Sequence, residues 1–100
     1  MVEEGYYFDP KHGGCLRKIA YFKKNNTYQI IGAYGNDEPD TGKKWTAVIN
    51  KTNKVNIFKV NFSGKKHITH GDYTFKWNKR DRKLYWEDGN VWILMYDWYG

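Results

Sequence analysis

Alternation of apolar and polar residues over short runs is the feature that most constrains the fold of this chain. No stretch keeps a helical apolar period, and the runs are separated by Gly, Asn, Asp and Lys. In the clearest run, Tyr73, Phe75 and Trp77 fall on one face of an extended strand, with Thr74 and Lys76 on the other. Such runs are typical of an all-β domain. A short strand at Tyr6-Tyr7-Phe8 also fits the pattern. Beside it, the runs predict about seven strands, at residues 15–23, 27–34, 44–50, 54–62, 70–77, 83–87 and 91–98.

The connections between these strands are short and rich in turn-forming residues, with Asp88-Gly89-Asn90 as the strongest turn signal. Within 54–62 the apolar positions change phase between Ile57 and Phe58, which predicts a β-bulge that bends the strand. Consecutive antiparallel strands of this kind predict an up-and-down barrel or a strongly curled meander. A two-sheet sandwich is the alternative.

One hundred residues are enough for one domain, which we place at 1–100. A content of 40% hydrophobic and 19% aromatic residues argues against disorder. The first residues, MVEEGYYFDP, are acidic where a signal peptide is basic, and no apolar run is long enough to cross a bilayer. With Cys15 as the single cysteine, we expect an intracellular or virion protein that is neither secreted nor inserted in a membrane.

Two motifs, HGGCLR at residues 12–17 and WEDGNVW at residues 86–92, resemble a small β domain found in algae, other protists and large DNA viruses. IGAYG at residues 31–35 and WTA at residues 45–47 look similar to the same domain. The resemblance covers nearly the whole chain. It implies an intracellular or viral β domain and carries no known activity.

Residues suited to catalysis or metal binding are few. His67 and His70 are three apart, which places them on opposite faces of an extended strand, so we expect no metal site. Cys15 with His12 has no evident third residue to orient a base, and a structural thiol is the simpler interpretation. The sequence contains no phosphate-binding glycine loop. We therefore expect a protein that is not an enzyme and has no cofactor.

Basic residues gather in alternate connections of the predicted meander. The chain has a net charge of +6 and a pI of about 9.4, which favours acidic partners. Because alternate connections lie at the same end of an up-and-down sheet, three turns should meet there. We call their cations the basic rim: Lys23, Lys24, Lys51, Lys54, Lys79, Arg80, Arg82 and Lys83. Trp77, Trp86 and Tyr85 lie near them in the sequence, so the rim is predicted to bind an anionic partner, with nucleic acid held by phosphate contacts and ring stacking.

The run at 91–98 is apolar on both faces, and a strand of this kind is usually covered on both. Its second face carries Val91, Ile93, Met95 and Tyr99. The last strand is also a candidate sheet edge. We therefore expect this face to contact a protein partner or a second copy, with a cap by Tyr6-Tyr7-Phe8 as the alternative.

Together these features predict an interaction or structural module, as part of a larger viral or intracellular assembly. Two other functions fit the composition. One is a nucleic-acid binding protein without sequence preference. The other is a carbohydrate-binding module that stacks sugars on Tyr28, Tyr34, Trp45 and Tyr85.

Overall fold

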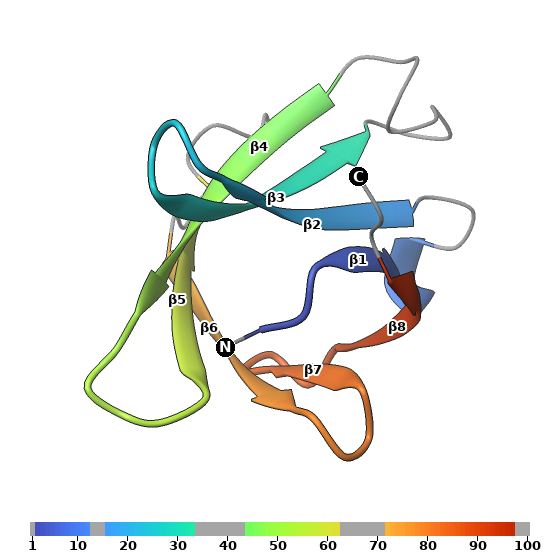
Figure 1. Ribbon diagram of the computed structural model, residues 1–100. Coiled ribbons are helices and arrows are strands. Elements are labelled where there is room, and N and C mark those ends of the chain that lie inside the picture. The colour runs from blue at the N-terminus through green and yellow to red at the C-terminus, as the bar shows by residue number, and fades with distance from the viewer. Residues whose placement is uncertain (1, 13–15, 34–43, 63–71, 98–100) are drawn as a thin grey trace.

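The alternating runs form strands that join edge to edge into a closed antiparallel barrel (Figure 1). The structure is a computed structural model, and it describes residues 2–12, 16–33, 44–62 and 72–97. A short 3-10 helix, η1, follows the first strand at Pro10–His12. The strands are β1 (Gly5–Phe8), β2 (Leu16–Phe22), β3 (Thr27–Ala33), β4 (Lys44–Lys51), β5 (Ile57–Asn61), β6 (Asp72–Asn78), β7 (Lys83–Trp86) and β8 (Val91–Asp97).

Pairing of β1 with β8 closes the ring and confirms the predicted barrel. Tyr6 pairs with Tyr96 and Tyr7 with Leu94, and the register shifts between these two pairs. The short N-terminal strand therefore raises the number of strands to eight. Two expectations for the run at 91–98 are wrong: β8 is bonded to both β7 and β1 and is not an edge, and β1 lies beside β8 rather than over its outer face.

The phase change in the run at 54–62 has a different cause from the predicted bulge. Strand β5 begins only at Ile57, and Val55 lies in the preceding turn with 86% of its surface exposed. Asn56 has a φ of 63°, so the chain reverses before the strand begins. From Ile57 onward the burial alternates regularly, with Phe58 and Val60 inside.

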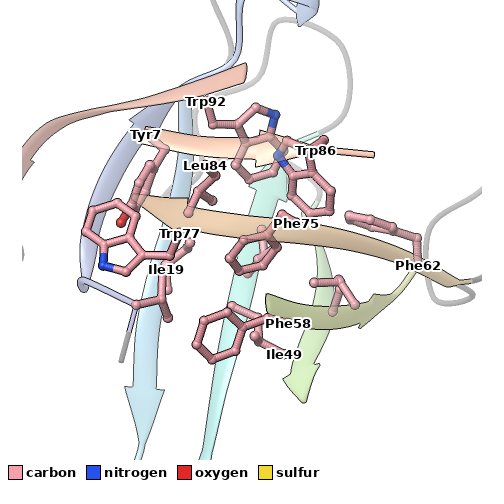
Figure 2. Packing of buried hydrophobic residues seen from close by; sticks show 14 of the residues in the cluster. Tyr7, Ile19, Ile49, Phe58, Phe62, Phe75, Trp77, Leu84, Trp86 and Trp92 are labelled. Carbon is pink, nitrogen blue, oxygen red and sulfur yellow. The ribbon is translucent and has the colours of Figure 1, made fainter. Parts of the chain in front are cut away.

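Aromatic side chains fill the interior of the barrel, as expected for eight strands. Phe58 and Phe75 stack with ring centroids 5.3 Å apart, and Phe75 lies 5.0 Å from Trp86. Trp86 continues the series to Trp92 at 4.9 Å (Figure 2). The described aromatic side chains therefore form a packed core inside the barrel.

A buried ion pair lies at the end of the barrel that holds the β1–β2 connection. Arg17 and Asp9 are each 2% exposed, and Nη2 of Arg17 lies 3.7 Å from Oδ2 of Asp9. The guanidinium lies between two indoles, 5.1 Å from the ring of Trp45 and 5.9 Å from that of Trp92. Asn90 donates from Nδ2 to Oδ1 of Asp9 at 2.9 Å. This ion pair therefore ties the β1–β2 connection to β2 and to the β7–β8 turn.

Candidate binding site at the basic rim

Three turns meet at the opposite end of the barrel, because alternate connections of an up-and-down barrel share one end. They join β2 to β3, β4 to β5 and β6 to β7, and they lie on the left and lower sides of Figure 1. All eight cations of the basic rim lie in these turns or directly beside them. The topology therefore brings together residues that are far apart in the sequence.

The three turns have one backbone feature in common. Each ends with a residue in the left-handed region: Asn26 with a φ of 55°, Asn56 with 63° and Arg82 with 56°. These are the positive-φ residues other than glycine among the described residues. Asparagine tolerates this conformation well, which explains its place before β3 and before β5. Each strand after a turn therefore starts from a similar chain reversal.

The side chains of the rim are accessible to solvent. Seven of the eight cations are exposed, and Lys83 is half-buried. The acids at this end are Asp81, Glu3 and Glu4 just before β1, and Asp97, which pairs with Gly5 at the end of β8. Asp81 accepts a hydrogen bond from the Tyr85 hydroxyl at 2.8 Å. Positive charge therefore exceeds negative charge at this end of the barrel.

Residues 2–4, which precede β1, pack against the core at this end of the barrel. Val2 is only 3% exposed and belongs to the core. The Tyr7 hydroxyl donates to the carbonyl of Glu3 at 2.6 Å. The hydrogen-bonded ladder between β1 and β2 ends at Gly5. Beyond it, the side-chain carboxylate of Glu4 accepts a hydrogen bond from the backbone N–H of Tyr21 at 2.7 Å. The segment before β1 is thus held in place by Tyr7 of β1 and by the backbone of Tyr21 in β2.

A hollow of about 340 Å³ opens between the β2–β3 turn and the start of the β4–β5 turn. We call it the rim hollow. Two tyrosines from paired positions of β2 and β3 contribute to it, Tyr21 and Tyr28, with ring centroids 5.0 Å apart and planes tilted by 55°. Its lining is mixed aromatic, aliphatic and polar: Tyr21, Asn26, Thr27, Tyr28, Ile49, Asn50, Lys51 and Phe58.

Partial burial raises the pKa of Tyr28 above its ordinary value of 10.0, and the charges of Glu4, Tyr21 and Glu3 raise it further. The phenol of Tyr28 is therefore neutral at physiological pH. A hydrogen bond from Tyr85 to Asp81 likewise raises the pKa of Tyr85. Both rings are thus uncharged at physiological pH and do not repel an anionic partner.

Of the three aromatic residues predicted to stack on a partner at the rim, two lie inside the barrel and one lies on its outer wall. Trp77 is 2% exposed and Trp86 is 7% exposed, and both point into the core (Figure 2). Neither indole fits a role in stacking on a partner at the rim. Tyr85 is 36% exposed on the outer wall of β7. Tyr21 and Tyr28 were not predicted as a pair, although the short turn at Asn25-Asn26 places them opposite each other.

The outer face of β8 is partly apolar and partly exposed, as the sequence suggested. Met95 is 54% exposed, and Val91 and Ile93 are half-buried. Phe8 of β1 pairs with Ile93, and Tyr85 of β7 pairs with Val91. The apolar surface therefore extends over three strands, while Tyr99 lies outside the described residues.

The other residues singled out from the sequence do not form a site in the described part of the chain. Cys15, Tyr34, His67 and His70 lie outside it. No three His, Cys, Asp or Glu residues within the described ranges are placed to hold a metal ion. Trp45, one of the candidate sugar platforms, is only 3% exposed. Among the described residues, no helix is long and apolar enough to span a membrane.

Comparisons with protein-family models, with curated proteins and with solved structures give no match. The resemblance of HGGCLR and WEDGNVW to a β domain of algae, protists and large DNA viruses therefore stays a prediction.

Proposed function

We propose that this protein is a binding module without catalysis, and that its basic rim holds a polyanion. The observation that carries the proposal is the convergence of three lysine- and arginine-bearing turns on one end of a rigid barrel. A closed barrel is a suitable scaffold for this task, because the ends of its strands fix the positions of the turns.

The electrostatics of the rim support an anionic partner. Eight exposed or half-buried cations outnumber the four acids at this end, so the local potential is positive. Exposed lysines gain affinity for a polyanion mainly by releasing its condensed counterions. Binding of this kind depends steeply on salt and carries no sequence preference.

Fluorescence anisotropy with a labelled single-stranded oligonucleotide, titrated at several salt concentrations, tests the proposal. We expect a linear fall of log K with log salt. Replacing Lys23, Lys51 and Lys54 by Gln should reduce the slope by about 2, because each lost phosphate contact contributes about 0.7 on a single strand.

The matched control removes the same charge elsewhere. Lys11, Lys59 and Lys76 are exposed and lie outside the rim, at η1 and on the outer wall of β5 and β6. Their triple replacement by Gln should leave the slope nearly unchanged. Equal losses from the two triple variants would mean that net charge alone attracts the anion, and an oligonucleotide that never binds would refute the proposal.

A second candidate function is self-association through the outer face of β8. Its supporting observation is the apolar surface of Val91, Ile93 and Met95, which Phe8 and Tyr85 extend. Lysines flank this surface, since Lys83 pairs with Ile93 and Lys76 with Tyr85. Two such faces repel at low salt, so a dimer formed through them should strengthen as salt rises.

Light scattering coupled to size exclusion separates the two functions, because salt acts on them in opposite directions. A dimer that persists or grows at high salt, and that Ile93→Lys dissociates, supports the β8 face. Thr46→Lys, at an exposed position of β4, is the control for added charge. A monomer at every salt concentration excludes the self-association.

A further inference from the structure

We propose that the rim hollow binds one unstacked base of a single-stranded nucleic acid, while neighbouring phosphates lie on the lysines of the rim. This inference rests on the proposed function and names the partner of the same site. It starts from the combination of two tyrosine rings with cationic turns, which plain polyanion binding does not require.

The rings are held in place before any partner arrives. The Tyr21 hydroxyl is hydrogen-bonded to the side-chain oxygen of Asn26, at the end of the β2–β3 turn. Tyr28 packs partly against the core, so its ring is supported from below. Tyr21 is 38% exposed and therefore presents an accessible ring at the open side of the hollow. A flat base can stack on such a ring whatever its identity.

The lining suits a heterocyclic base better than a phosphate. Ile49 and Phe58 are 7% and 5% exposed and provide an apolar surface, while Asn26 and Asn50 add amide groups at its border. The volume of about 340 Å³ is at the lower end of ligand pockets, which typically span about 300–1,000 Å³. The hollow thus offers aromatic and apolar surface for a ring, with polar side chains beside it that can meet the edge of a base.

Cations lie where the sugar–phosphate chain would leave the hollow. Lys51 lines it, and a second hollow of about 220 Å³ beside it is lined by residues 51–58. Lys51 and Phe58 belong to both, so the two hollows adjoin, and Lys54 lies on the second. Glu4 lies on the opposite side of β3 from β4, since it accepts from the N–H of Tyr21 in β2. Its charge and that of Glu3 act on Tyr28. The strand should therefore leave the hollow toward the β4–β5 turn, away from these acids.

The test compares two oligonucleotides of equal length and charge, oligo-dT and an abasic strand with the same sugar–phosphate backbone. We expect oligo-dT to bind about tenfold more tightly, the effect of stacking one base. In NMR spectra, the ring signals of Tyr21 and Tyr28 should shift with oligo-dT and stay in place with the abasic strand.

Variants locate the base. Tyr21→Ala should abolish the preference for oligo-dT without changing binding of the abasic strand, and Tyr21→Phe should retain it. Val48→Ala, at an exposed position of β4, should leave the affinity for both strands unchanged. Tyr85→Ala tests the alternative that the base stacks on the outer wall, where Tyr85 offers a similarly exposed ring.

Each outcome points to a different failure. If both strands bind equally and the rim lysines matter, the polyanion function stands and the base site is refuted. A preference that Tyr85→Ala removes and Tyr21→Ala retains also refutes the base site, since the base then stacks on the outer wall. If neither strand binds, the proposed function itself fails.

Discussion

Gly32 provides the space for the indole of Trp45 inside the barrel. The two residues pair across β3 and β4, and a Cβ on Gly32 would lie 2.2 Å from Cζ2 of Trp45. Such a contact forces the ring to move in a packed core. We expect Gly32→Ala to lower the free energy of unfolding by about 1–3 kcal/mol, measured by urea denaturation.

Combining this change with a smaller ring tests its cause. In a Trp45→Phe background, Gly32→Ala should cost less than it does alone, because the clash is with the indole. Gly89→Ala is the comparison for backbone strain without a clash, since Gly89 has a φ of 93° and no atom within 4 Å of the added carbon. Additive effects of the two core substitutions would contradict the proposed clash.

Tyr28 makes stability depend on pH in the alkaline range. Its raised pKa means that the folded chain holds the phenolic proton more tightly than the unfolded chain does. The free energy of unfolding should therefore fall as pH rises above the ordinary pKa of 10.0. Tyr28→Phe should make this fall shallower in urea denaturation between about pH 9 and pH 11. An unchanged profile would contradict the prediction.

Burial is the largest cause of the raised pKa of Tyr28, and the charge of Glu4 is the second. Glu4→Gln keeps an oxygen to accept from the N–H of Tyr21 and removes the negative charge. The pKa of Tyr28 should move down toward its usual range, which the ultraviolet absorbance of tyrosinate can follow. An upward movement would contradict the assigned cause.

At the scale of elements, the ion pair of Asp9 and Arg17 joins β2 to strands with which it shares no ladder, because Trp45 of β4 and Trp92 of β8 flank the guanidinium. Asp9 also accepts hydrogen bonds from the backbone of Lys11 and from Asn90. Asp9→Ala would leave the guanidinium of Arg17 buried without its carboxylate. We expect a loss of about 3–5 kcal/mol in the free energy of unfolding, measured by chemical denaturation.

An exposed carboxylate provides the control for this substitution. Asp72 accepts from Nδ2 of Asn61 at 2.8 Å on the surface. Asp72→Ala should cost less than about 1 kcal/mol, the usual value for an exposed polar pair. Similar costs for the two aspartates would show that burial of the ion pair adds nothing.

Strand positions followed from the sequence, because alternation records which side chains face a core. The same rule assigns Trp77 to the interior with Phe75, so its placement at a binding surface conflicted with the pattern itself. The Arg17–Asp9 pair had no such signal. Arg17 is charged and stands beside Lys18, yet it is 2% exposed, and the approach of Trp45 on β4 and Trp92 on β8 explains its burial.

The basic rim shows which features of the site the sequence predicts and which it does not. Turn order alone placed eight cations at one end, since alternate connections share an end. It did not reveal the rim hollow, which depends on the tilt of Tyr21 against Tyr28 and on the depth of Ile49 and Phe58. The sequence predicted a barrel or a curled meander and left the choice open, because closure depends on the pairing of a four-residue strand with β8.

For the whole molecule, closure through β1 and β8 has a kinetic consequence. All other ladders join strands that are adjacent in sequence, whereas this ladder joins Gly5–Phe8 to Val91–Asp97. Bringing such distant segments together carries the largest loop entropy in the fold, so this ladder should form last during refolding. In pulse-labelling hydrogen exchange, amides between β2, β3 and β4 should become protected before those between β1 and β8, and the reverse order would contradict this. A chain emerging from the ribosome would therefore hold β1 beside β2 alone, as an open curved sheet, until its eighth strand has been synthesised.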